Sequence, residues 1–159
     1  MTFAEHLHHA LAEQRGLLDS MAALLDQEQR WIVELDPVNL QGVTEQKEEV
    51  LAAIEASRAR LARILADNGA GKTVSAAIET VPATGQDALR ALQQDVLRAA
   101  GTMDEKLSLN GRLLDRALGT INHSLNFFVG MFKRGGGTYG QKGVMVSSSP
   151  HSQILHKEI

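Results

Sequence analysis

The sequence predicts an all-α protein, an elongated antiparallel helical bundle or coiled coil of three long helices with a flexible C-terminal tail. Apolar residues recur at alternating steps of three and four positions over long stretches, which is the spacing of a helix face that packs along another helix. No stretch shows the strict apolar and polar alternation of a half-buried strand. At 159 residues the chain fits one helical domain, expected over residues 1–132, followed by a tail over 133–159.

The first periodic segment predicts a helix over about residues 2–35. Its stripe runs through Phe3, Leu7, Ala10, Gln14, Leu17, Met21, Leu24, Glu28, Trp31 and Leu35. A helix of roughly 33 residues is about 50 Å long, so it needs another long helix to pack against. We expect Asp36-Pro37 to end it, because a proline disfavours helical geometry in the residue before it.

A second helix is expected over about residues 43–66, after a short link at 38–43. Thr44 is the candidate N-cap, and Glu45, Glu48 and Glu49 follow near the positive end of the helix. Such a short link between two long helices predicts an antiparallel hairpin. Residues 67–85 hold several glycines and a brief apolar patch, which indicates a loop with a helical turn; a short fourth helix there stays open.

The third periodic segment predicts a helix over about residues 86–132. Asn110 takes a core-type position in it, where a buried polar residue that fixes the register is expected before any catalytic role. From Leu125 to Phe132 the pattern becomes apolar on nearly every side, and Phe127, Phe128 and Phe132 are half of the chain's aromatic residues. Two explanations stay open for this end: it binds a partner, or it closes the bundle.

Composition and charge exclude several classes of protein. Without cysteine the chain has no zinc-thiolate site, no thiol redox chemistry and no cysteine nucleophile. The net charge is -3, and the few basic residues of the tail are too sparse for a phosphate-binding arm, so no nucleic-acid partner is expected. The N-terminus lacks a secretory signal pattern, and no apolar run reaches the ~20 residues of a membrane span. We therefore expect neither a secretory signal nor stable membrane insertion.

Two patterns suggest chemistry and are set aside. The stretch Asn68–Thr73 ends like a phosphate-binding loop, but Ala66 stands where that motif needs glycine, and a helical pattern precedes it in place of a strand. His6, His8 and His9 form the one histidine cluster, yet no third ligand shares a helix face with them clearly. We therefore expect no catalytic site, no cofactor and no metal, and hence no enzyme.

Three stretches together resemble the FlgN family of flagellar type III export chaperones. The first is Val43–Leu51, which opens the second helix after a short loop. The second is Leu109-Asn110-Gly111-Arg112-Leu113-Leu114, similar to the family's Asn-Gly-x-Leu-Leu in the last long helix. The third is Thr138–Gly143, similar to the family's Tyr-Gly-x-x-Gly in the tail. Their order and spacing cover most of the chain.

The resemblance implies a cytoplasmic chaperone without ATPase activity that binds C-terminal helical segments of the hook-filament junction proteins, FlgK-like and FlgL-like. It would prevent their premature association and deliver them to the flagellar export gate and ATPase complex. Family behaviour places cargo binding in the last helix, which here gives the candidate residues Asn110, Leu114, Ile121, Leu125, Phe127, Phe128, Met131 and Phe132. Docking on the export gate carries over to Tyr139, Gly140 and Gly143.

Two other functions stay open beside this one. In a self-assembling coiled-coil structural or adaptor protein, the heptads of residues 3–35 and 89–131 would pair between chains, with a homodimer as the simplest form. Attachment to a membrane surface through residues 127–132 is less favoured, because the polar face lacks the enrichment in basic residues that such helices carry.

Overall fold

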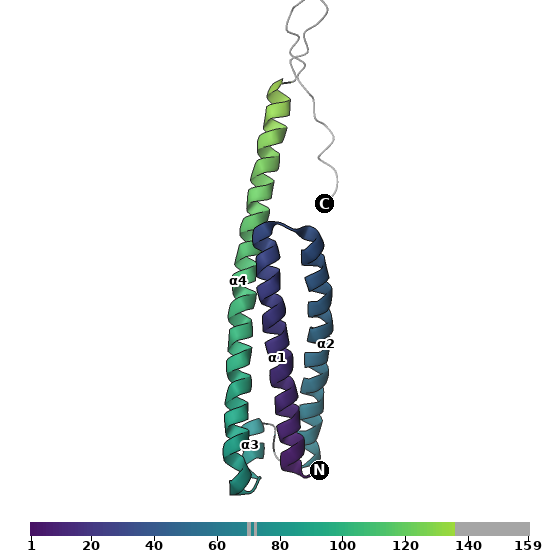
Figure 1. The fold of residues 1–159 in the computed structure, drawn as a ribbon, viewed down its shortest axis with the longest axis vertical. Coiled ribbons are helices and arrows are strands. Elements are labelled where there is room, and N and C mark those ends of the chain that lie inside the picture. Colours follow the sequence, from purple (N-terminus) through teal and green to yellow (C-terminus); the bar gives the residue numbers. More distant parts are fainter. Residues whose placement is uncertain (70, 72, 136–159) are drawn as a thin grey trace, which may run out of the picture. The chain divides into compact units, whose positions relative to one another are not determined.

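The structure is a computed structural model that describes residues 1–69, 71 and 73–135. Within these residues the chain forms four helices and no strand: α1 (Phe3–Glu34), α2 (Pro37–Asp67), α3 (Val74–Glu79) and α4 (Ala83–Gly135) (Figure 1). This confirms the all-α class, and the short fourth helix that the sequence left open is α3. The chain divides into two compact units, residues 1–117 and 118–159.

Three expected helix boundaries were wrong. The second helix begins at Pro37 and has no link over residues 38–43, because the Asp36 carboxylate accepts hydrogen bonds from the amides of Val38 and Asn39 and so caps the helix, with proline in its first turn. Thr44 is therefore no N-cap: it lies within α2, and its hydroxyl donates to the carbonyl of Leu40. The last long helix begins at Ala83, before the expected residue 86, and runs to Gly135, beyond 132.

The turn between α1 and α2 consists of Leu35 and Asp36. Leu35 adopts left-handed backbone geometry, with φ 54°, and its amide and that of Asp36 donate to the last carbonyls of α1. The chain thus reverses in two residues, and α1 and α2 form the antiparallel hairpin that the sequence predicted. At the other end of α1, Thr2 and Glu5 exchange hydrogen bonds in a capping box.

Ion pairs between helices define the register of the first unit. Arg60 and Lys47 of α2 pair with Glu13 and Glu28 of α1, so position increases along one helix as it decreases along the other. Two further pairs join α1 to α4, Arg15 with Asp95 at 2.7 Å and Asp26 with Lys106, and both span 80 positions. The constant separation shows that α1 runs parallel to this part of α4, while α2 runs antiparallel to α1 (Figure 1).

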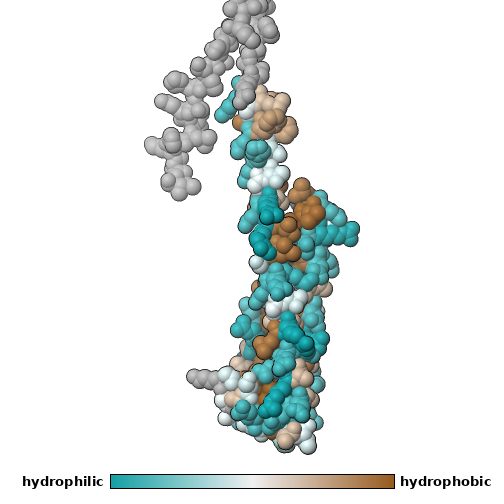
Figure 2. All heavy atoms as spheres, turned by 90° about the vertical axis from the view of Figure 1, so that its left-hand side faces the viewer, coloured by the Kyte–Doolittle hydropathy of each residue, from teal (hydrophilic) through white to brown (hydrophobic). Residues whose placement is uncertain are grey.

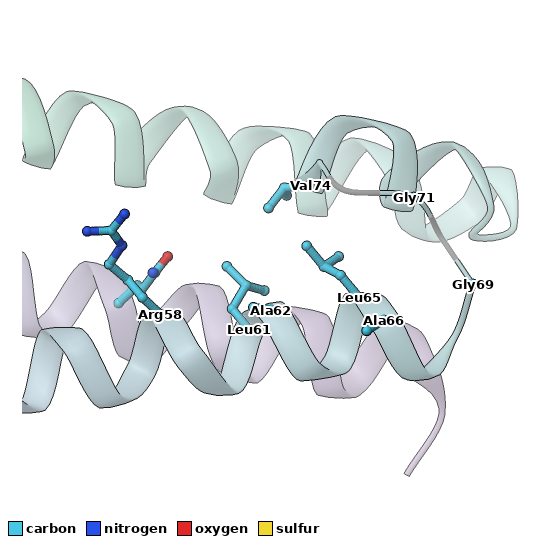
Figure 3. A pocket seen from close by; sticks show the side chains of 9 residues that line it. Arg58, Leu61, Ala62, Leu65, Ala66, Gly69, Gly71 and Val74 are labelled. Carbon is cyan, nitrogen blue, oxygen red and sulfur yellow. The ribbon is translucent and has the colours of Figure 1, made fainter.

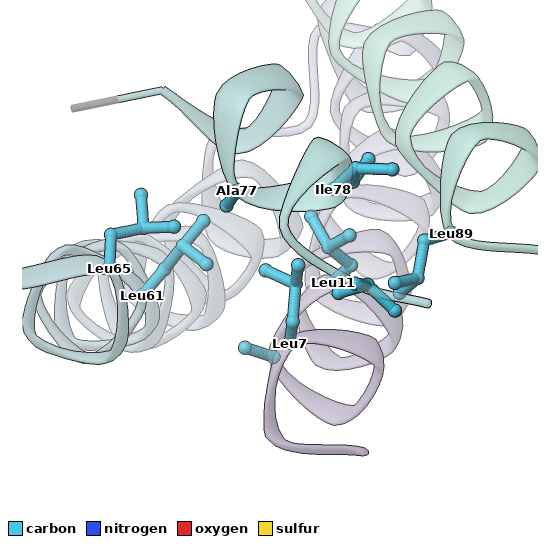
Figure 4. Close-up of a cluster of buried hydrophobic side chains, with 9 residues drawn as sticks. Leu7, Leu11, Leu61, Leu65, Ala77, Ile78 and Leu89 are labelled. Atoms are coloured by element: carbon cyan, nitrogen blue, oxygen red, sulfur yellow. The ribbon is translucent and has the colours of Figure 1, made fainter. Parts of the chain in front are cut away.

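The main core of the first unit joins all four helices near the N-terminal end of α1. It consists of Leu7, Ala10, Leu11, Leu61, Leu65, Ala77, Ile78, Val81 and Leu89, and Figure 4 shows most of these side chains pointing toward one another. Leu7 and Leu11 have no more than 2% of their surface exposed. The six-residue helix α3 contributes Ala77 and Ile78, whose side chains are no more than 1% exposed. Helix α3 is therefore part of the core.

Candidate functional site

A polar layer joins the three long helices of the first unit. The side-chain amide of Asn110 in α4 donates to the carbonyl of Leu25 at 2.8 Å and to the Glu28 carboxylate at 2.9 Å, both in α1. The other oxygen of Glu28 accepts a hydrogen bond from Lys47 of α2 at 2.6 Å. Asn110 is 4% exposed, and the side chains of Glu28 and Lys47 are mostly covered. A buried polar contact is satisfied only in one alignment of the helices, so this layer favours that alignment.

The burial of Asn110 separates it from the other candidate partner-binding residues. Its side chain faces α1 and is covered in this structure, so it cannot belong to an accessible surface together with them. The sequence predicts that Asn110 is a buried polar residue that fixes the helix register, and this placement agrees with that prediction. Leu114, four residues further along, is 40% exposed and belongs to the first unit.

The remaining candidates lie on the helical part of the second unit, residues 118–135, and all are exposed. Phe127, Phe128 and Phe132 are 62%, 55% and 81% exposed. Leu118, Ile121, Leu125, Val129 and Met131 are exposed by 44% to 57%. Figure 2 shows hydrophobic side chains on the surface toward this end of α4.

Seven of these eight side chains form a surface with two parts. We call the seam the residues at steps of three and four, which are Leu118, Ile121, Leu125, Phe128 and Phe132. We call the flank Phe127 and Met131, which are four residues apart and therefore neighbours on the helix. The rings of Phe127 and Phe128 meet edge to face, with their centroids 6.0 Å apart, so the flank and the seam are in direct contact.

The surface carries no formal charge. Between Leu118 and Phe132 there is no Asp, Glu, Lys or Arg, and the polar side chains are those of asparagine, serine, threonine and histidine. A helical face of exposed leucine, isoleucine and phenylalanine without charges can bind another apolar face by the hydrophobic effect. It offers no group for acid-base or nucleophilic chemistry apart from the hydroxyls and the imidazole of His123.

A second candidate surface, which is concave, lies in the first unit, where α2 ends. A groove of about 750 Å³ runs between the end of α2, the connection at Gly69 and Gly71, and Val74 of α3, with Arg58 at one end (Figure 3). Leu61 and Leu65 form much of its apolar wall. This groove could not be predicted from the sequence, because it depends on how the connection after α2 folds back, which no periodic pattern encodes.

Of the two patterns that suggested chemistry, the loop pattern has a structural role at Thr73. The hydroxyl of Thr73 accepts a hydrogen bond from the amide of Ala76 and so caps α3. His6 and His9 line a small pocket with Glu13, whose carboxylate pairs with Arg60. In the described part of the chain no group of three histidine, cysteine or carboxylate side chains is arranged to hold a metal ion. Among the same residues, none of the helices is both long and apolar enough to cross a lipid bilayer.

The residues expected to dock on an export gate, Tyr139, Gly140 and Gly143, lie outside the described residues.

Comparison with known proteins identifies one matching family. A family model described as FlgN protein matches residues 1–147, which is nearly the full length. Neither the curated proteins nor the solved structures contain a match to this chain.

Proposed function

Because the chain belongs to the FlgN family of flagellar export chaperones, we propose that it holds the C-terminal helical segments of hook-filament junction proteins, FlgK-like and FlgL-like, before export. The observation that carries this proposal is the exposed, uncharged surface of seam and flank on residues 118–132. Three phenylalanines that are more than half exposed make a chain prone to aggregation unless a partner covers them.

The physical reasoning concerns what an unassembled cargo needs. A cargo helix that will later pack in an assembly has an apolar face with no partner before assembly, and such a face promotes premature association. An exposed apolar face on another helix can cover it, in a helix-to-helix contact whose apolar anchors are spaced three and four residues apart. Release requires no covalent chemistry, and we propose a role without enzymatic activity.

Delivery to the export apparatus belongs to the same proposal and rests on the family resemblance. Tyr139, Gly140 and Gly143 would contact the export gate and ATPase complex, and the binding surface on α4 would hold the cargo meanwhile. This role places the protein in the cytoplasm. A Tyr139→Ala variant should keep its affinity for cargo and lose export of the junction proteins in a motility assay; loss of both would assign Tyr139 to the cargo site.

The direct test is binding of the purified full-length protein to the C-terminal segment of a FlgK-like protein, measured by calorimetry. A variant with Leu125, Phe128 and Phe132 each changed to Gln should bind at least 100-fold more weakly, because each exposed apolar anchor contributes on the order of 1 kcal/mol or more. The matched control changes Val38 and Leu97 to Gln, which are 79% and 64% exposed in the first unit, and should bind as the parent does.

Two results would count against the proposal. If the parent protein does not bind the segment, the cargo assignment fails. If the triple variant binds as tightly as the parent, the binding surface lies elsewhere, and the groove beside α3 becomes the next place to examine.

Burial of the first heptad stripe argues against part of the alternative function, a self-assembling coiled coil. Leu7, Ala10, Met21 and Leu24 of the first heptad stripe are buried within the same chain, so they are not available to pair between chains. The exposed apolar surface on residues 118–132 remains available for self-association. Light scattering over a dilution series measures this directly, and a stable oligomer without cargo would favour assembly.

A further inference from the structure

The width of the α4 surface limits what can cover it. Successive residues of a helix point about 100° apart, so the seam from Phe128 to Leu118 occupies roughly 80° of the helix circumference. A single packed helix covers a stripe of about 100°, which accommodates the seam. Phe127 and Met131 each precede a seam residue by one position, so they point about 100° away from Phe128 and Phe132. One partner helix on the seam therefore leaves the flank exposed.

The flank is too large and too exposed to be neglected. Phe127 is 62% exposed and Met131 55%, and the contact between the rings of Phe127 and Phe128 continues the apolar surface without a polar residue between them. From Phe127 around to Val129, across the face that holds the seam, exposed apolar side chains span about 200°, with the hydroxyl side chains of Thr120 and Ser124 among them. The rest of the circumference carries asparagines, His123 and two glycines.

The exposed apolar area also favours a partner that covers both the seam and the flank. The three phenylalanines together leave about 400 Å² exposed, given ~200 Å² for a whole aromatic side chain. A stable complex covers about 800 Å² on each partner, so a helix that contacts the seam alone reaches that area with difficulty. Covering the seam and the flank together adds four further side chains that are each about half exposed.

We infer that the occupant of this surface presents two amphipathic helices from one partner chain, one packed along the seam and the second over Phe127 and Met131, both with uncharged contact faces. The inference rests on the proposed function, since it specifies the form of the cargo. A second copy of this chain fits less well: in a two-helix contact it brings the same single helix, which covers the seam and leaves the flank in water. The uncharged faces follow from the absence of Asp, Glu, Lys and Arg between Leu118 and Phe132, because a charged residue buried against them would have no partner.

The test compares two probes against the full-length protein. The first is an intact FlgK-like junction protein, and the second is a peptide of its last predicted helix alone. The flank variant carries Phe127→Gln and Met131→Gln, and the seam variant carries Leu125→Gln and Phe128→Gln. Each residue is more than half exposed, and unchanged thermal unfolding by circular dichroism checks that each variant folds.

We expect the parent to bind the intact protein at least tenfold more tightly than the peptide. The flank variant should lose roughly tenfold or more in affinity for the intact protein and less than twofold for the peptide, whereas the seam variant should lose at least tenfold for both. A flank variant that binds the intact protein as the parent does, or that weakens both probes equally, overturns the two-helix inference and leaves the proposed function standing.

Two other results separate the remaining occupants. If the parent dimerises on its own and the flank variant is monomeric, a second copy covers the flank, and the inference is wrong. If the parent binds neither probe, the proposed function fails together with the inference.

Discussion

Single residues at the α1–α2 turn determine where the chain reverses. Asp36 is the N-cap of α2, and the amide and side chain of Asn39, with the amide of Val38, donate hydrogen bonds to its carboxylate. These hydrogen bonds, that from the Asn39 amide foremost, hold the pKa of Asp36 below its ordinary value of 3.8. They favour the charged carboxylate, as expected at the positive end of a helix.

The lowered pKa predicts how stability depends on pH. Because the carboxylate is favoured in the folded state, Asp36 stabilises the protein above pH 3.8, and this contribution is lost as the pH falls through the lower folded pKa. An NMR titration of the Asp36 side chain should therefore show a midpoint below 3.8. Asp36→Asn, which retains a capping side chain, should flatten the loss of stability over this acid range; a midpoint at or above 3.8 would contradict the cap.

At the scale of elements, α3 is the least predictable part of the fold and yet part of its core. The long helices could be predicted because their apolar residues repeat over many turns, whereas α3 is only six residues long and shows no period. The start of α2 was missed for a related reason: Asp36-Pro37 ends one helix and also begins the next, and the sequence pattern alone reveals only the first role. Asn110 could be placed in the core from its position in the repeat, but its partners Leu25 and Glu28 could not, because register between helices is a tertiary property.

The core role of α3 predicts a large effect of a small change. Ile78 is 1% exposed among side chains of α1, α2 and α4, so Ile78→Ala should lower the free energy of unfolding by about 2–5 kcal/mol through lost burial and the cavity left behind. Val38→Ala, at 79% exposure, serves as the control and should change it by less than about 0.5 kcal/mol. Urea denaturation measures both; similar small effects would mean that α3 is detached from the core in solution.

At the scale of the whole molecule, charge and apolar surface are separated along the chain. The net charge is -3, and the ion pairs that set the register all lie within the first unit. The second unit keeps its exposed apolar residues free of formal charge from Leu118 to Phe132. The sequence located this apolar segment, because composition changes there; its exposure could not be predicted, since bundle closure and partner binding require the same residue types.

This separation predicts that cargo binding depends little on salt. Attraction between charged surfaces weakens as ionic strength rises, because the Debye length falls from about 10 Å at 0.1 M to about 3 Å at 1 M. Apolar association is not screened and is strengthened by sulfate. We therefore expect the dissociation constant for a FlgK-like C-terminal segment to change less than about threefold between 0.05 and 0.5 M sodium chloride, and to fall in sodium sulfate.

The same salt titration would also reveal the alternative, in which charge attraction contributes to cargo binding. Lys133 follows the surface directly, and the body of the chain is acidic, so either could attract a charged cargo over a longer range. In that case affinity would drop more than tenfold over the same salt range, and Lys133→Gln would reproduce part of the loss at low salt. Weak salt dependence together with loss of binding in the seam variant would instead assign the affinity to the apolar side chains, because neither charge screening nor the removal of Lys133 would then affect the contact.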